Sequence, residues 1–284
     1  MLRGSLRFED GSTGSLVAKR AASEDDAARE ERFYREVGVD FAPRFLGAVN
    51  GLLLLEDVGG RQGDVLAGCS VEEAELVLER VARFHAAHRG GREGFPRWGR
   101  DPHARQERHA SRVDAFIERY GAQLPAVVVG LADALRTQLA SVLAELAATS
   151  PALIHGDLHL DNVLFDAGDR PVVVLDWQHA ATGPAAWDVA LFLYGSLAPD
   201  DRRSVEDEVM AQCARELGCS PRELRRDCAL ALLVQLAGLI GWLSRAPSSD
   251  AGPRELAVRE RALADGRLIA ALADLPEGVV RPDA

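Results

Sequence analysis

Residues 153–188 read LIHGDLHLDNVLFDAGDRPVVVLDWQHAATGPAAWD, and the interpretation of the whole chain starts from them. We read a strand end at 152–154, a polar loop, a short strand at 162–165, a turn at 166–170 and a second strand at 171–175. The second strand has four consecutive apolar residues after a proline, a composition that favours full burial. The sequence therefore predicts a β-hairpin that follows a polar loop.

Polar side chains gather at the loop ends of these strands. The first loop holds a cluster of groups that can bind metals or move protons: His155, Asp157, His159, Asp161 and Asn162. Asp176 follows directly after the second strand. Asp157 and Asn162 have the spacing of a kinase catalytic loop, H-x-D-x-x-x-x-N, and Asp176 takes the place of the metal-binding aspartate of the next hairpin.

This set of residue types suits phosphate transfer to a hydroxyl group. A hydroxyl nucleophile needs a carboxylate within hydrogen-bond reach that orients it and takes its proton. A nucleoside triphosphate needs a divalent cation held by oxygen ligands, and an asparagine amide with an aspartate carboxylate supplies them. We expect the hairpin to bring the two metal ligands to one point, because they lie on adjacent loops.

The motif HGDLHLDNVLF followed by VLDWQ resembles the aminoglycoside phosphotransferase/choline kinase family, which has the protein-kinase-like fold. The variants LDNVLF and DWQ are most similar to its ecdysteroid-kinase-like group of small-molecule kinases. The resemblance implies that Asp157 is the catalytic base and that His155 braces the catalytic loop. It further implies that Asn162 and Asp176 hold magnesium. Asp188, in AAWDVALFL, matches the helix aspartate that supports the loop by accepting main-chain hydrogen bonds.

An alternative is a hydrolytic metal site. His155, Asp157 and His159 alternate, so on a strand they would share one face and bind a metal together. Gly156 favours a loop instead, and no second His/Asp cluster elsewhere in the sequence completes such a site. For His159 and Asp161 we expect solvated loop positions.

Composition limits the classes of partner. The 284 residues suffice for one bilobal unit or two domains. The net charge of −11, without a basic stripe, argues against a nucleic-acid partner. The four cysteines form no C-x-x-C pair, which favours reduced thiols and a cytoplasmic location. The apolar run Ala229–Leu243 is shorter than the roughly 20 residues of a membrane span, so we expect a buried core helix and no membrane association.

One lysine stands out in the N-terminal part. Of the 33 lysines and arginines, only Lys19 is a lysine. Strands at 2–10 and 15–19 around a turn at 11–14 predict a β-hairpin. The resemblance assigns the nucleotide phosphates to Lys19, where a compact charge on a flexible stem reaches them without the planar bulk of arginine.

A helix should follow this hairpin. Ser23 can cap it, and the helix should end near Gly38. A protein-kinase-like fold needs a helix glutamate that positions the lysine, and among Glu30, Glu31 and Glu36 the resemblance points to Glu30.

The resemblance also divides the chain. The class is α+β, with an N-terminal nucleotide-binding lobe at 1–57, a hinge at 58–64 and a helical lobe at 65–284 that carries the catalytic loop and the acceptor site. Main-chain groups of about Glu56 to Val58 would pair with adenine. The family's first strand and Gly-rich loop would precede residue 2, so we expect a small lobe without them. The last predicted helix spans 254–273.

These expectations together describe an ATP- and Mg²⁺-dependent phosphotransferase that moves the γ-phosphate to a hydroxyl of a small molecule, such as an aminoglycoside-like metabolite. The residues do not choose between ATP and GTP. The alternative is a non-catalytic nucleotide-binding or scaffolding protein of the same fold, suggested by the expected lack of the Gly-rich loop. The retained Asp157, Asn162 and Asp176 favour the enzyme.

Overall fold

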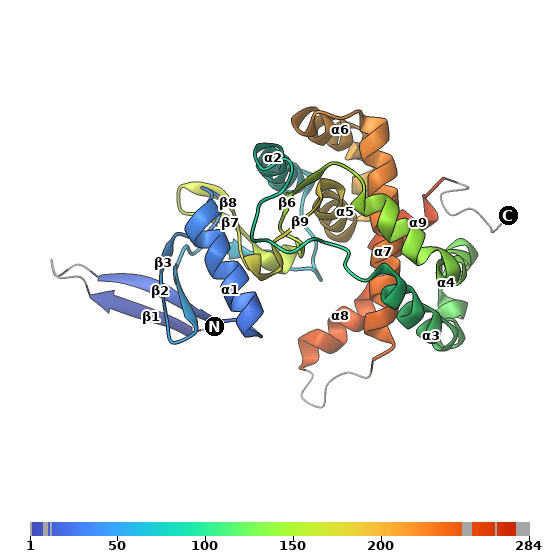
Figure 1. Ribbon diagram of the computed structural model, residues 1–284, viewed down its shortest axis with the longest axis horizontal. Helices are drawn as coiled ribbons and strands as arrows, with labels where there is room; N and C mark the ends of the chain where they lie inside the picture. The colour runs from blue at the N-terminus through green and yellow to red at the C-terminus, as the bar shows by residue number, and fades with distance from the viewer. Residues whose placement is uncertain (1, 8–10, 12, 246–251, 265, 277–284) are drawn as a thin grey trace.

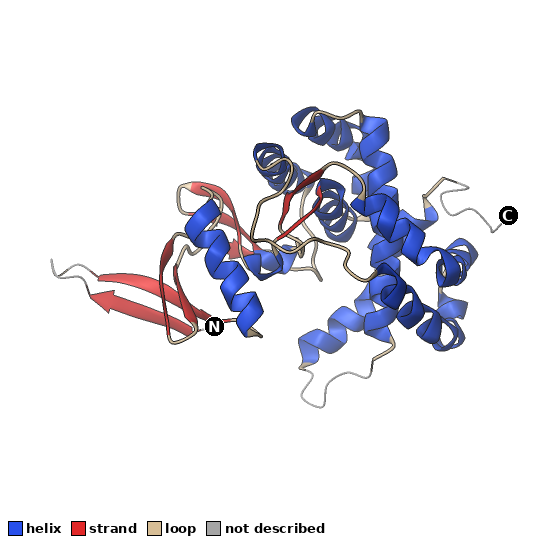
Figure 2. Ribbon diagram, viewed as in Figure 1, coloured by secondary structure: helices blue, strands red, loops and turns tan. Residues whose placement is uncertain are grey.

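The computed structural model describes residues 2–7, 11, 13–245, 252–264 and 266–276. A small antiparallel sheet forms one end of the molecule, and a larger helical part forms the other (Figure 1). Figure 2 shows the sheet of the small part with one helix beside it, and short strands among the helices of the large part. The predicted α+β class with a small sheet lobe and a large helical lobe is confirmed.

The small lobe has one four-stranded sheet of order β1-β2-β4-β3. Its strands are β1 (Leu2–Arg7), β2 (Thr13–Arg20), β3 (Phe45–Val49) and β4 (Leu52–Glu56). The predicted hairpin is present, because β1 pairs with β2 in antiparallel register. Within the predicted turn at 11–14, residue 12 lies outside the described residues.

One helix accompanies this sheet. Helix α1 (Glu24–Arg32) begins where Oγ of Ser23 accepts a hydrogen bond from the main-chain N–H of Asp26, the N-cap that the sequence predicts. It continues as the π-helical turn η1 (Phe33–Val37) and ends at Gly38, which adopts a positive φ of 46°. The stop at Gly38 follows from the left-handed conformation that glycine adopts without steric cost.

The connection to the helical part is itself paired. Strand β5 (Arg61–Gln62) lies inside the predicted hinge and pairs with β7 (Val163–Ala167) of the catalytic region. Gly60 allows this close approach, because a Cβ there would lie 2.7 Å from the carbonyl oxygen of Phe165. Helix α2 (Val71–Ala87) then begins with the predicted capping box of Ser70 and Glu73.

The catalytic region consists of short strands and turns: β6 (Pro151–Ile154), η3 (Leu160–Asn162), β7 (Val163–Ala167), β8 (Arg170–Val174), η4 (Trp177–His179) and β9 (Ala181–Pro184). The three predicted strands are present, and β7 and β8 form the predicted hairpin. Strand β9 was not predicted. It has only four residues, ATGP, and it forms because its partner β6 lies beside it.

The helices of the large part are α3 (Pro102–Tyr120), η2 (Gly121–Gln123), α4 (Ala126–Ala147), α5 (Ala185–Ser196), α6 (Pro199–Leu217), α7 (Pro221–Leu243), α8 (Pro253–Ala264) and α9 (Arg267–Ala273). The single helix predicted for 254–273 is wrong. Gly266 adopts a positive φ of 68° and separates α8 from α9. By length and composition α4 and α7 could each cross a membrane, a test that core helices of soluble proteins also pass.

An aromatic cluster joins the two parts. The ring of Phe33, at the end of α1, stacks on Trp177 with centroids 3.8 Å apart. Phe84 of α2 meets the same indole edge-on at 5.2 Å, and Phe41 lies 6.1 Å from it. Trp177 and Phe33 are fully buried. Such stacked and edge-on pairs stabilise beyond their buried area, so the cluster sets how α1 lies on the catalytic region.

Candidate active site

Lys19 connects three elements of the site. Its Nζ lies 2.6 Å from Oε2 of Glu30 on α1 and 2.8 Å from Oδ1 of Asp176, which follows β8. Glu30 is completely buried, and burial raises its pKa, which the neighbouring Lys19 offsets only in part. The structure therefore brings together Lys19, Glu30 and Asp176, three residues singled out in the sequence.

The backbone at Asp176 is strained. Asp176 has φ 63° and ψ 63°, the left-handed conformation that non-glycine residues seldom adopt. Oε1 of Glu30 accepts a hydrogen bond of 3.2 Å from the main-chain N–H of Trp177. Glu30 thus uses both oxygens to hold Lys19 and the turn after Asp176. Strain of this kind persists where the surroundings over-determine it, typically at functional sites.

Asp188 of α5 supports the start of the catalytic loop. It is fully buried, and its carboxylate accepts main-chain hydrogen bonds from His155 at 2.6 Å and from Gly156 at 2.9 Å. This is the geometry that the resemblance implies for Asp188. His85 of α2, buried beside it, places Nε2 2.9 Å from the same carboxylate.

His155 braces the loop through its ring. Nε2 lies 2.8 Å from the carbonyl oxygen of Leu175, and Nδ1 accepts a 3.2 Å hydrogen bond from the main-chain N–H of Asp157. Burial lowers the pKa of His155 despite the nearby carboxylates, so the neutral ring donates from Nε2 and accepts at Nδ1. His155 therefore holds the loop without touching solvent. With both ring nitrogens engaged, it is not available to bind a metal.

Asp157 points out of the loop as a charged group. Its side chain is 42% exposed and lies with Oδ2 3.4 Å from Nε2 of His159. Burial alone would raise the pKa of Asp157, but the hydrogen bond and the charge of His159 act against it, and the pKa lies below its ordinary value. Asp157 is thus an ionised carboxylate that can accept a proton.

Two loop residues differ from the prediction of solvated positions. Nε2 of His159 faces Asp157 and, at 3.1 Å, Nδ2 of Asn162. Burial would lower the pKa of His159, but Asp157 raises it above its ordinary value. When the ring is charged, its Nε2–H donates to Asp157. When the ring is neutral, Nε2 can accept from Nδ2 of Asn162. Asp161 accepts a hydrogen bond from the N–H of Val65 and pairs with Arg254 of α8. The prediction fails because other elements fold onto this loop.

The predicted metal ligands lie on adjacent segments. The main-chain N–H of Leu175 donates a 2.8 Å hydrogen bond to the carbonyl oxygen of Asn162, which brings Asn162 beside Asp176. Nδ2 of Asn162 donates to the carbonyl oxygen of Asp157 at 2.9 Å. Within the described ranges no residue donates a hydrogen bond to Oδ1 of Asn162. This amide oxygen and the carboxylate of Asp176 fit a hard divalent cation such as Mg²⁺.

The described residues do not support the hydrolytic metal site. Among them, no group of three or more His, Cys, Asp or Glu side chains is arranged to hold a metal. Residues 155–159 form a loop between β6 and η3, so the alternation of His155, Asp157 and His159 does not put them on one strand face. Gly156 suits this loop, since its φ is 86° and a Cβ would lie 2.4 Å from the carbonyl oxygen of His179.

The predicted hinge follows β4. The main-chain N–H of Glu56 donates to the carbonyl oxygen of Arg44 at 2.9 Å, and its carboxylate pairs with Arg170 at 2.9 Å. Both groups of Glu56 are thus used within the protein. No described residue hydrogen-bonds to the main chain of Val58, so its N–H and carbonyl are free to meet a nucleotide base. Adenine pairing at 56–58 stays a prediction.

Sequence reasoning missed two contributors, His85 and His159. His85 occupies the buried face of α2, and its polar ring in an apolar stripe was the available signal. His159 sits two positions after Asp157, and its approach to Asn162 depends on the η3 turn.

Comparisons with known proteins agree with this geometry. The sequence matches the phosphotransferase enzyme family over residues 5–218. A homoserine kinase of Xanthobacter autotrophicus is 29% identical over 239 residues, 75% of this chain and 73% of that protein.

Two solved structures share the fold. Choline kinase from Cryptosporidium parvum aligns over 98% of this chain and 91% of its own, with 13% identity and a TM-score of 0.59. The GDP complex of wild-type aminoglycoside 2'-phosphotransferase-IIIa aligns over 94% and 93%, with 18% identity and a TM-score of 0.57. With a family match over three quarters of its length, the chain belongs to the phosphotransferase enzyme family, a family of small-molecule kinases.

Proposed function

We propose that this protein transfers the γ-phosphate of a nucleoside triphosphate, ATP in the first instance, to a hydroxyl group of a small molecule, with Mg²⁺ as cofactor. The observation that carries the proposal is the bridge from Lys19 to Glu30 and Asp176 at 2.6 and 2.8 Å. A buried lysine held between two carboxylates is a phosphate-binding group in position, directly beside a magnesium ligand.

Each residue of the site has a distinct task. Asp157, ionised and partly exposed, orients the acceptor hydroxyl and takes its proton as the oxygen attacks the γ-phosphorus and the nucleoside diphosphate leaves with the bridging oxygen. Lys19 binds phosphate oxygens, and Glu30 keeps it in place. His155 and Asp188 act by positioning the loop, since they contact its main chain and not the reacting atoms.

Asn162 and Asp176 would hold Mg²⁺, which offsets the charge of the triphosphate when bound. The donor set supports this assignment, because it offers an amide oxygen and a carboxylate oxygen, the ligand types that Mg²⁺ prefers. Lys19 forms an ion pair with this same carboxylate of Asp176 at 2.8 Å. Lys19 would therefore share the carboxylate of Asp176 with the cation. Its second partner, Glu30, holds the lysine in place when Mg²⁺ binds Asp176.

The names of the relatives support a small hydroxylated acceptor. Homoserine and choline each carry one primary hydroxyl group, and the proteins similar to this chain include a homoserine kinase and a choline kinase. The chemistry of the site is common to all such acceptors. The choice among them belongs to residues outside the catalytic loop.

The test is phosphate transfer from ATP or GTP with Mg²⁺ to a panel of homoserine, choline, ethanolamine and amino sugars. Transfer to one acceptor that disappears in Asp157→Asn supports the proposal. The control is nucleotide binding by Asp157→Asn, measured as a thermal shift, which should equal that of the wild type.

Two other outcomes count against parts of the proposal. Nucleotide binding without transfer to any member of a broad hydroxyl panel would favour the non-catalytic alternative. A thermal shift with ATP that is the same with Mg²⁺ and with EDTA would contradict the magnesium assignment, and Asp176→Asn should abolish the Mg²⁺-dependent part of the shift.

A further inference from the structure

A small cavity that none of the active-site residues line carries an unusual charge. It has a volume of about 180 Å³ and lies where α3 packs against α4 and α7. Its charged lining consists of Arg105, Arg108 and Arg112 of α3 together with Arg245 just after α7. Among the described residues, no carboxylate lines it.

These four arginines have no acidic partner within the part of the chain that the structure describes. This is unusual here, since the protein has a net charge of −11 and its other arginines commonly pair with carboxylates. Arginines gathered without counter-charges repel each other. Burial, together with the charge of Arg108, lowers the pKa of Arg105. Arg105 and Arg112 are half-buried, so an anion bound between them would relieve this repulsion, whereas Arg108 and Arg245 are exposed and screened by solvent.

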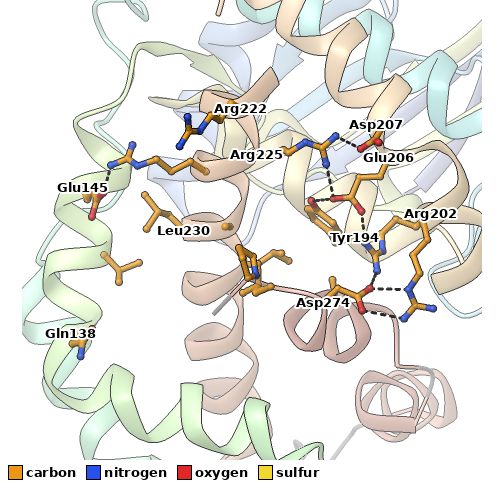
Figure 3. A pocket seen from close by; sticks show the side chains of 18 of the residues that line it. Gln138, Glu145, Tyr194, Arg202, Glu206, Asp207, Arg222, Arg225, Leu230 and Asp274 are labelled. Carbon is orange, nitrogen blue, oxygen red and sulfur yellow. Dashed lines mark hydrogen bonds and ion pairs between the residues drawn. The ribbon is translucent and has the colours of Figure 1, made fainter. Parts of the chain in front are cut away.

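A larger cavity has the opposite arrangement of charge. It has a volume of about 950 Å³, lies among α4, α5, α6, α7 and α9, and is also rich in arginine (Figure 3). Four of its five arginines are paired within the protein: Arg202 and Arg203 with Asp274, Arg225 with Asp207 and Arg226 with Glu145. The fifth, Arg222, has no ion pair with a described residue. Because most of these guanidinium groups are paired and four carboxylates line the cavity, it attracts an anion less than the small cavity does.

Glycines in the wall of the small cavity leave space beside the guanidinium groups. Gly238 and Gly241 of α7 face it, and a Cβ at Gly238 would meet no atom within 4 Å. At Gly241 a Cβ would lie 3.3 Å from Nη1 of Arg112, so the small residue lets this guanidinium approach the helix. A glycine inside a helix is less favourable than an alanine, because it loses more conformational freedom on folding. A ligand that occupies this space would explain why two glycines of α7, Gly238 and Gly241, face the same cavity.

We propose that this pocket of α3 and α7 is a binding site for a small oxyanion, either free phosphate or a terminal phosphate or carboxylate group of a small molecule. Guanidinium groups recognise both by paired N–H donors. The volume suits one such group, since sites for whole drug-sized ligands occupy about 300–1,000 Å³.

Contacts connect the pocket with the catalytic loop. The guanidinium of Arg105 lies over the ring of Trp98 at 5.9 Å, and that ring lies 4.9 Å from the ring of Trp187. Nε1 of Trp187 donates a 2.9 Å hydrogen bond to the carbonyl oxygen of Gly156, beside Asp157. A separate anion bound to Arg105 would therefore contact residues that support the catalytic loop. Alternatively, the anion is a charged group of the acceptor molecule itself.

Calorimetry and thermal shift with inorganic phosphate test the site, with NaCl at equal ionic strength as reference. We expect saturable binding by the wild type, and an affinity lower by at least about tenfold in Arg112→Gln, the usual loss for a charged hydrogen bond. Arg119→Gln, the same change on the same helix outside the pocket, should bind as the wild type does. Equal binding by Arg112→Gln and wild type would overturn the proposal.

A second variant tests the space and not the charge. Gly238→Leu fills the open volume, keeps all four arginines and improves helix propensity, so it should fold and still lose phosphate binding. Lys19→Gln should keep phosphate binding, which separates this pocket from the nucleotide site. Loss in Lys19→Gln together with retention in Gly238→Leu would place the anion in the active site and contradict the inference.

A kinetic measurement distinguishes the two sources of the anion, and it rests on the proposed function. With an acceptor that is phosphorylated, phosphate that raises KM for the acceptor and leaves kcat unchanged marks the pocket as part of the acceptor site. Phosphate that changes kcat marks a separate effector site. Calorimetry needs no turnover, so failure of the proposed function leaves the binding test intact.

Discussion

At the scale of single residues, the site depends on one compact cation. The side chain of Lys19 is 11% exposed and contacts a carboxylate from α1 and another from the turn after β8. An ammonium group fits between two carboxylates at these distances, whereas a planar guanidinium is larger and points its donors in fixed directions. The single lysine in an arginine-rich chain is explained by this geometry.

Lys19→Arg should therefore reduce kcat/KM for ATP by about 10²-fold, the cost of a small misplacement of reacting groups. Arg20→Lys, at the exposed neighbouring position, is the matched control and should change nothing. Steady-state kinetics with varied ATP measure both. Full activity of Lys19→Arg would mean that charge alone, and not shape, is needed at this position.

Asp157→Ala should lower turnover by about 10²–10⁴-fold, the usual contribution of a general base. Binding of nucleotide, measured by calorimetry with Mg²⁺, should stay within a factor of two or so, since Asp157 contacts none of Lys19, Glu30 and Asp176 in the described contacts. An unchanged rate would remove Asp157 from the mechanism.

At the scale of elements, α5 and α2 hold the catalytic loop. The carboxylate of Asp188 accepts hydrogen bonds from two main-chain N–H groups and meets the ring of His85. All of these groups are buried or nearly so. A buried donor left without its acceptor costs about 1–3 kcal/mol, so α5 contributes to loop geometry and to stability through one side chain.

Asp188→Ala should lower the free energy of unfolding by at least about 3 kcal/mol, because several buried donors lose their acceptor together. Asp201→Ala, which removes an exposed carboxylate from α6, should change it by less than about 0.5 kcal/mol. Urea unfolding followed by circular dichroism gives both values. A loss below 1 kcal/mol or so in Asp188→Ala would show that water replaces the carboxylate.

At the scale of the whole molecule, the aromatic contact between Phe33 and Trp177 fixes how the small part lies on the helical part. Glu30 precedes Phe33 by less than one helical turn, and Trp177 follows Asp176 directly. The contact that joins the lobes therefore also aligns Lys19, Glu30 and Asp176. Phe33→Leu should weaken nucleotide binding through this alignment without touching a polar group.

Buried histidines make the stability of the molecule depend on pH. Burial lowers the pKa of His109 from the ordinary value of 6.5, and burial does the same to His155. Below pH 6.5 these histidines bind protons in the unfolded chain but stay neutral in the folded protein. Their contribution to stability is therefore full above pH 6.5 and falls as the pH decreases.

His109→Gln should flatten this decline by up to about 1.4 kcal/mol per pH unit between pH 6.5 and the lower pKa of the folded state. The amide can keep the hydrogen bond that Nε2 makes with the carbonyl oxygen of Ala132. Urea unfolding at pH 7.5 and 5.5 measures the difference between variant and wild type, which cancels the opposite effect of His159. Parallel pH curves would show that His109 titrates normally when folded.

Local spacing was enough to predict part of the site. Asp157 and Asn162 share one loop, Asp176 directly follows a buried strand, and Lys19 lies in a strand with a turn before it. Short segments have few conformations, because each residue has only two soft dihedral angles and hairpins pair locally. The family and the α+β class followed from these segments.

Only the tertiary structure shows which side chains meet across long separations. The resemblance pointed to Glu30, and the structure gives the reason: Glu30 faces Lys19, whereas Glu31 pairs with Arg35 and Glu36 with Arg32 on the outside of the same helix. The local pattern likewise did not show the role of His85 or the contacts of His159. It also did not show that the arginines between α3 and α7 lack an acidic partner among the described residues. These contacts depend on how helices pack. Packing is set by the summed burial of many side chains, so no single stretch of sequence contains it.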